Sequence, residues 1–217
     1  MSSDEISWVL LQQPDAWLIL DKVQRQLEEE ARMKEVYLAT VTEQEKAELI
    51  NGTIVHHSPV KTRHADASED LFILLRIYAR KHKLGRVGHE KMAIECSRNI
   101  YEPDICFWSL EVSSRFEPDQ MLFPPPAYIA EVLSPSTTDA DRGIKFRDYA
   151  AHGVQEYWII DPEHQVIEAY DTHEGLFLLR GKYQGETPLE VRSLPGLNFP
   201  ARAVFESTVH DQALHSI

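Results

Sequence analysis

The chain has 217 residues, 43% of them hydrophobic, and its 22 Lys and Arg against 35 Asp and Glu give a formal net charge of −13. The apolar content excludes a chain that is disordered throughout, and the acidic total excludes a uniformly basic coat for nucleic acid. The two cysteines, Cys96 and Cys106, argue against a disulfide framework or a cysteine-based zinc site and favour a reducing compartment. Because no apolar stretch reaches the ~20 residues of a membrane span, we expect a cytoplasmic protein with no membrane partner.

The first 40 residues read as an appendage to a single domain. A helix is predicted to start at Asp15 and to run to the acidic residues Glu28–Glu30. Its apolar residues recur at helical spacing: Trp17, Leu18, Leu20, Val23 and Leu27. We therefore expect residues 1–40 to form an N-terminal helical extension that packs or dimerises; the alternative is a loosely attached arm.

The largest basic region of the sequence lies between residues 61 and 91, with eight Lys or Arg and four Asp or Glu. The spacing of Leu71, Leu74 and Tyr78 predicts a helix from about His64 to His82 within it. Three of its cations recur at helical spacing and are candidates to contact nucleic-acid phosphates: Arg76, Arg80 and Lys83. The alternative is an ordinary solvated helix face.

The remaining elements alternate in type along the chain. Asn51-Gly52 predicts a turn between two short strands within residues 48–55. Apolar runs predict further strands, and capping residues after Ser134 predict one helix. The strands are expected at 91–96, 103–108, 127–133, 156–161, 166–171, 176–183 and 189–199, and the helix at 139–152. This order predicts a mixed α/β or α+β domain over residues 41–205, followed by a C-terminal tail at 206–217.

Two carboxylates in apolar strands are the strongest chemical signal. Asp104 begins one predicted strand, and Glu131 lies inside another. If the two strands are neighbours, the carboxylates converge and form a hard-oxygen site that suits Mg²⁺ or Mn²⁺. Lys145, on the following helix, would then assist a water and stabilise charge on a phosphate. The alternative, equally weighted on spacing alone, is a structural ion pair between Glu131 and Lys145.

A longer set of motifs is similar to a known family. Pro103-Asp104 is followed by the run Glu131-Val-Leu-Ser-Pro-Ser136 and by Asp141-Arg-Gly-Ile-Lys145, and the strand at 156–161 ends in Asp-Pro162. Together with residues 48–52 these resemble the Uma-two family of restriction-endonuclease-like proteins, in the PD-(D/E)XK nuclease superfamily. The resemblance covers roughly residues 40–205. It implies a restriction-endonuclease-like core, a mixed sheet flanked by helices.

The resemblance also implies roles for individual residues. Asp104 and Glu131 would be metal ligands and catalytic residues together with Lys145, Glu48 a third carboxylate, and His64 a neighbour of the site. The superfamily lysine lies two residues after the acid, but Leu133 holds that position here. Lys145 would therefore have to replace the superfamily lysine from its helix.

Two functions follow as hypotheses. The first is a Mg²⁺-dependent endonuclease, a hydrolase that acts on DNA and works as a homodimer because two sites match the two strands. The second is a non-enzymatic interaction module that keeps the nuclease fold, which the acidic total charge favours.

Overall fold

The computed structural model describes residues 3–42 and 45–217; residues 1–2 of the expected extension and 43–44 of the expected domain lie outside this description. The helices are α1 (Ser3–Leu11), α2 (Ala16–Thr40), α3 (Thr62–Lys81), α4 (Leu110–Ser113), α5 (Thr138–Asp141), α6 (Ile144–Ala151) and α7 (Ser207–Ser216), with a 3₁₀ helix η1 at Ala201–Val204. The strands are β1 (Ala47–Ile50), β2 (Thr53–His56), β3 (Gly85–His89), β4 (Ala93–Cys96), β5 (Asn99–Tyr101), β6 (Ile105–Ser109), β7 (Leu122–Phe123), β8 (Tyr128–Val132), β9 (Glu156–Asp161), β10 (Val166–His173), β11 (Leu176–Tyr183), β12 (Pro188–Glu190) and β13 (Asn198–Pro200).

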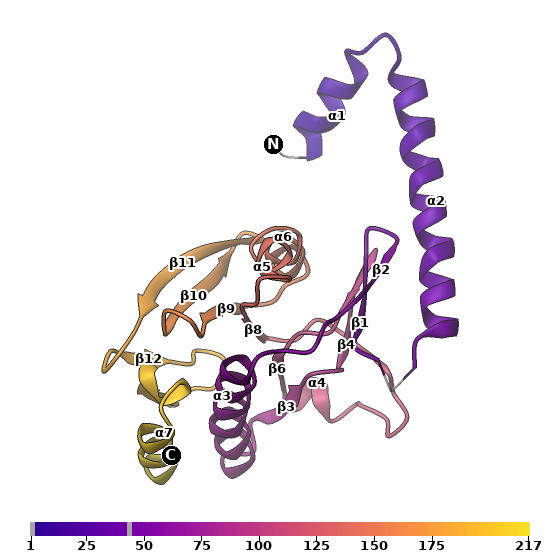
Figure 1. The fold of residues 1–217 in the computed structure, drawn as a ribbon. Coiled ribbons are helices and arrows are strands. Elements are labelled where there is room, and N and C mark those ends of the chain that lie inside the picture. The colour runs from indigo at the N-terminus through magenta and orange to yellow at the C-terminus, as the bar shows by residue number, and fades with distance from the viewer. Residues whose placement is uncertain (1–2, 43–44) are drawn as a thin grey trace.

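A six-stranded mixed sheet, in the order β11-β10-β9-β8-β6-β3, carries most of the core. Strands β8 and β9 are parallel, and β6 pairs with β8 antiparallel. Helix α3 and the C-terminal helices cover one face, and α5 and α6 cover the other (Figure 1). Side chains alternate between these faces, so Tyr128 packs on the α3 side and Ile129 on the α6 side. The expected mixed sheet flanked by helices is confirmed.

A second, five-stranded sheet has the order β2-β1-β5-β4-β7. Its β1–β2 hairpin turns at Asn51 and Gly52, whose φ angles of 48° and 74° are the positive values that such a tight turn needs. The chain leaves this sheet after β5 and enters the larger one at β6. Residues 102–104 therefore join the two sheets.

The expected helix at 139–152 is two helices. Helix α5 ends at Asp141, and α6 begins only at Ile144. At Gly143 a Cβ atom would lie 2.4 Å from the carbonyl oxygen of Asp139, which any side chain would have to displace. The short α6 keeps Lys145 in its first turn, directed into the protein.

Several further segments differ from expectation. Strands β3 and β5 were not predicted, because β3 contains two glycines and β5 has only three residues. The single strand expected at 189–199 is two short strands, β12 and β13, that pair with each other. Most of the expected C-terminal tail is helix α7, whose buried Val209 and Ala213 join the core on the α3 side.

The N-terminal extension is an arm of two helices, and only one end of it is docked (Figure 1). Glu30 of α2 accepts two hydrogen bonds from Arg98, at 2.7 and 2.8 Å, and Tyr37 donates one to the carbonyl of Ala47. Towards the N-terminus the apolar residues stay in water, with Trp8 64% and Trp17 82% exposed. Although α2 has 25 residues, no helix in the described ranges has the length and apolar content to cross a membrane.

Candidate active site

Asp104 and Glu131 lie on the α6 side of the larger sheet. Strands β6 and β8 pair with Ile105 opposite Ala130, so the next positions place Asp104 opposite Glu131. The Asp104 amide donates to Glu131 Oε2 at 3.3 Å, and the Val132 amide donates to Asp104 Oδ2 at 2.9 Å. The strand register thus brings the two acids to one point.

Lys145 reaches this point from α6. Its side chain is 2% exposed, and its ammonium contacts three carboxylates. These are Glu48 at 2.9 Å, Glu131 at 3.1 Å and Asp141 at 3.3 Å. Glu48 comes from β1 of the other sheet, so the lysine links both sheets. The structural ion pair between Glu131 and Lys145 is present, but as one part of a larger cluster.

Further polar groups surround the carboxylates. Lys46 Nζ lies 2.7 Å from Asp104 Oδ1, and His64 Nε2 lies 3.3 Å from Asp104 Oδ2. His57 Nε2 lies 3.1 Å from Glu48 Oε2, and the Tyr149 hydroxyl donates to Glu131 at 2.9 Å. The sequence placed His64 near the site but assigned no role in it to Lys46, His57 or Tyr149. One feature of the sequence could have indicated Lys46. It lies two residues before Glu48, and in an extended chain side chains two residues apart point to the same side.

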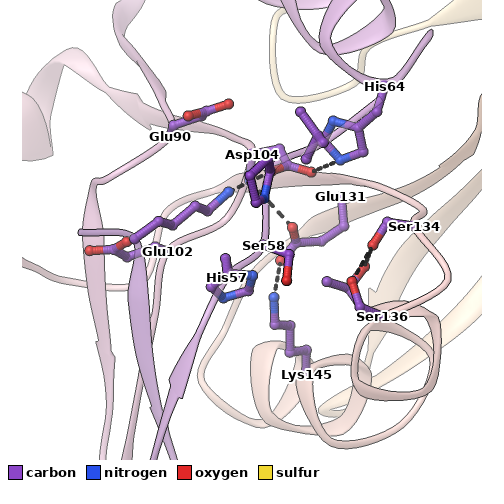
Figure 2. A pocket seen from close by; sticks show the side chains of 14 residues that line it. His57, Ser58, His64, Glu90, Glu102, Asp104, Glu131, Ser134, Ser136 and Lys145 are labelled. Atoms are coloured by element: carbon purple, nitrogen blue, oxygen red, sulfur yellow. Dashed lines mark hydrogen bonds and ion pairs between the residues drawn. The ribbon is translucent and has the colours of Figure 1, made fainter. Parts of the chain in front are cut away.

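A cavity of about 260 Å³ is lined by most of these side chains, but not by Glu48 or Tyr149. Figure 2 shows Asp104, Glu131 and Lys145 directed to its centre, with His57 and His64 at its sides. Ser134 and Ser136, read as helix caps, line the same cavity, and the N-cap of α5 is Thr137. The cavity is large enough for water and one small charged group.

The site holds more negative than positive charge. Lys46 and Lys145 contact four carboxylates, those of Asp104, Glu48, Glu131 and Asp141. Glu90 and Glu102 line the same cavity, so its acidic groups outnumber its two lysines.

The protonation of the carboxyl groups reflects this excess. Burial, together with the neighbouring carboxylates and against the pull of Lys145, raises the pKa of Glu131 to about 8. Burial also opposes ionisation of Glu48, but Lys145 and His57 outweigh it and lower the pKa of Glu48 to about 2. For Asp104 the histidine and Lys46 likewise outweigh burial, and its pKa lies below the usual range. Of these three acids, Glu131 therefore binds a proton most readily.

The candidate DNA-binding residues lie elsewhere. His64 is in the first turn of α3, and Arg76 follows twelve residues later, about 18 Å further along the helix at 1.5 Å per residue. The Arg76 guanidinium lies over the Phe72 ring and donates to the Val87 carbonyl at 3.4 Å. Lys61 and Arg63 lie nearer, in a pocket of about 300 Å³ that shares His64 and Ser134 with the site.

A family model described as "Putative restriction endonuclease", Uma2, matches residues 28–202. The chain belongs to the Uma2 family. The match includes both sheets and the cavity but leaves out α1 and the exposed part of α2. The family resemblance expected for residues 40–205 is confirmed, and it extends into the docked end of α2.

Two individual proteins are similar to this Uma2 member. The "Uncharacterized protein slr1290" of Synechocystis is 31% identical over 116 residues, which are 53% of this chain and 59% of that protein. The chain thus matches less than two thirds of this relative. A crystal structure from Anabaena variabilis, of "a putative nuclease belonging to DUF820", superposes with a TM-score of 0.67 at 17% identity. The superposition covers 78% of this chain and 94% of that one and establishes a shared fold.

We expect Lys145→Met to destabilise the protein by ~3–5 kcal/mol near neutral pH, because removal of one partner leaves buried carboxylates unpaired. Without the ammonium these groups bind protons more readily in the folded than in the unfolded state. The difference in unfolding free energy between the wild type and this variant should therefore shrink as the pH falls to about 5. Urea unfolding at both pH values measures it.

The control for this experiment is Lys182→Met. Lys182 also pairs with a glutamate, Glu168 at 2.7 Å, but its side chain is 60% exposed, so its loss should cost less than ~1 kcal/mol. Equal costs for the two variants, or a Lys145→Met deficit that grows in acid, would show that the lysine does not hold the cluster together.

Proposed function

We propose that this protein is a metal-dependent endonuclease that hydrolyses phosphodiester bonds in DNA. The observation that supports it most is the convergence of Glu48, Glu131 and Asp141 on the buried Lys145, with Asp104 directly beside Glu131. Membership of a family described as restriction endonucleases agrees with this proposal.

Asp104 and Glu131, with Glu48 as a third carboxylate, would hold Mg²⁺ or Mn²⁺. Their donors are hard oxygens, and the proton on Glu131 would be displaced by the cation. Bound there, the ion would supply Lewis-acid activation of a water and of the phosphate. Cysteine, a ligand that would favour Zn²⁺, is not among the described residues that line this cavity.

The protein's own residues have separate tasks in this proposal. Lys145 stabilises negative charge that develops on the phosphate, because it is buried and its position is fixed by the carboxylates. His64 and Lys46 orient Asp104 from opposite oxygens. His57 holds the second oxygen of Glu48.

We expect purified protein to nick plasmid DNA in Mg²⁺ or Mn²⁺, and to lose this activity in EDTA. Asp104→Asn and Glu131→Gln should each reduce cleavage by more than the ~10–100-fold that loss of an outer-shell partner costs. Glu163→Gln, on the neighbouring pocket, is the control and should cut normally. Cleavage that persists in Asp104→Asn, or wild-type protein inactive with both metals, contradicts the proposal.

Exposed cations in the second half of α3 and just after its end would contact DNA outside the cavity. Arg76, Arg80 and Lys83 are all exposed and would engage phosphates of the flanking duplex. Each lost phosphate contact should lower the slope of log affinity against log salt by about 0.9. We expect the triple alanine variant to bind DNA more weakly and with the flatter slope, measured in Ca²⁺, and Arg115→Ala to bind as the wild type. An unchanged slope in the triple variant assigns DNA binding to another surface.

We also propose a homodimer formed through the arm. Trp8 and Trp17 expose large apolar surfaces that a second copy would cover. Light scattering should show a dimer for the full chain and a monomer for the double variant Trp17→Gln, Leu18→Gln. Glu28→Gln, on the same helix, should remain dimeric. A wild-type protein that stays monomeric at high concentration contradicts the dimer.

One observation favours the second function, an interaction module that retains the fold. The apolar end of the arm lies outside the residues that the family model matches, as expected of a part added for binding. In that case the wild type cleaves no DNA in either metal, and the arm variants lose a protein partner.

A further inference from the structure

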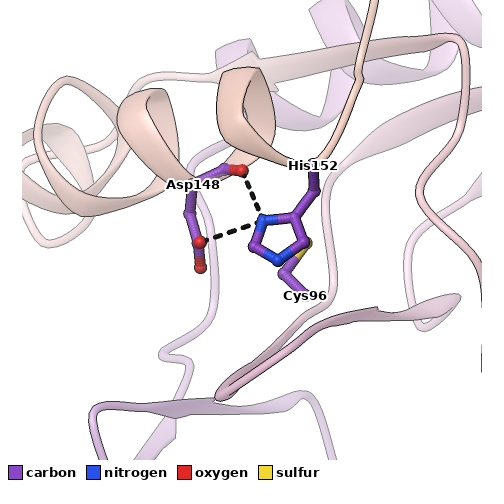
Figure 3. A group of neighbouring side chains, drawn as sticks. All are labelled: Cys96, Asp148 and His152. Atoms are coloured by element: carbon purple, nitrogen blue, oxygen red, sulfur yellow. Dashed lines mark hydrogen bonds and ion pairs between the residues drawn. The ribbon is translucent and has the colours of Figure 1, made fainter. Parts of the chain in front are cut away.

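Three side chains with metal-binding atoms meet where strand β4 ends near helix α6 (Figure 3). Cys96 is the last residue of β4, Asp148 lies on α6, and His152 follows the end of that helix. One ligand atom from each lies within 4.8 Å of the other two. None of the three is among the described residues that line the active-site cavity, so this cluster is a separate feature.

The carboxylate of Asp148 is held by neighbours that leave one oxygen for the cluster. Its Oδ2 accepts hydrogen bonds from Asn99 Nδ2 at 2.7 Å and from the Tyr101 hydroxyl at 2.8 Å. Its Oδ1 lies 3.1 Å from His152 Nδ1. Metal-binding carboxylates are typically oriented by such outer hydrogen bonds.

The imidazole and the thiol complete the set. His152 is one helical turn after Asp148, and its Nδ1 also lies 2.8 Å from the Asp148 carbonyl oxygen. Its Nε2 contacts the Ser97 hydroxyl. Cys96 is fully buried; burial and the nearby Asp148 carboxylate raise the pKa of its thiol to about 12. A divalent cation would reverse this, because it neutralises a thiolate and a carboxylate together.

We propose that Cys96, Asp148 and His152 form a second metal site, which binds Zn²⁺. One sulfur, one nitrogen and one oxygen ligand suit this ion, and bonds of 2.0–2.3 Å in a tetrahedron place ligand atoms about 3.3–3.8 Å apart. Asp148 Oδ1 and His152 Nδ1 are already 3.1 Å apart, and one ligand atom from each of the three residues lies within 4.8 Å of the other two. The site differs from a cysteine-based one, which the composition argues against, because a single thiolate is joined by two other ligand types.

The ion would tie together parts of the chain that carry the active site. Cys96 belongs to the hairpin of β4 and β5, and β5 leads to Asp104. Asp148 lies on the same short helix as Lys145. Zinc would thus fix α6 against the five-stranded sheet. It has no part in the cleavage proposed above, so this site is tested independently of nuclease activity.

The test uses Co²⁺ as the probe, added to the purified full-length protein. A thiolate bound to Co²⁺ gives a charge-transfer band in the near ultraviolet, whereas the oxygen ligands of the active site give none. We expect the band to saturate with one equivalent of Co²⁺ and to disappear when Zn²⁺ is added. Cys96→Ser should abolish it. The other buried cysteine provides the matched control, since Cys106→Ser should keep the band.

A second measurement covers the case in which Cys96→Ser does not fold. Zn²⁺ should raise the melting temperature of the wild type and of Asp104→Asn, because an ion that binds only the folded state stabilises it. His152→Gln should lose this shift in melting temperature. Its affinity for Zn²⁺ should fall by more than the ~10–100-fold that the loss of an outer-shell partner costs. A wild type without the thiolate band, or a Zn²⁺ shift retained in His152→Gln, overturns the site and leaves an ion pair between Asp148 and His152.

Discussion

A buried ammonium group needs carboxylates around it, and Lys145 finds three that come from separate parts of the chain. Glu48 belongs to the five-stranded sheet, Glu131 to the six-stranded sheet, and Asp141 to the helix before α6. Burying an ion costs several kcal/mol unless its partners are well placed. The positions of both sheets and of the break before α6 are therefore linked to one side chain.

The same cluster sets the chemistry of the cavity. Four carboxylates surround two lysines, and burial together with the neighbouring acids raises the pKa of Glu131. In the metal-dependent function proposed above, a divalent cation would compete with a proton for Glu131.

The local parts of this arrangement were predictable from the sequence. Helix α3 follows the spacing of its leucines, the Asn51-Gly52 turn follows from positive φ angles, and β9 follows a continuous apolar run. Glu131 lies within a similar apolar run. Because burial of an unpaired charge is costly, the sequence also predicted that this acid has a partner.

The parts that depend on tertiary contacts were not predictable. The break between α5 and α6 includes Gly143, where a side chain would meet the Asp139 carbonyl, and glycine alone does not reveal such an approach. Lys46 and His57 are ordinary polar residues near strand ends, and they acquire partners only when the two sheets meet. Cys96 and His152 are 56 positions apart and come together only because β4 ends near α6.

The passage of the chain from one sheet to the other at residues 102–104 has a consequence for folding. Glu102 accepts from the Ala47 amide, and its own amide donates to Glu48, while Asp104 pairs with Lys46. The start of β1 is thus bound to the linker that leads into β6. Opening of either sheet would break contacts of both, so the two form one cooperative unit. Amide hydrogens in β1 and β8 should then exchange with solvent through the same opening event.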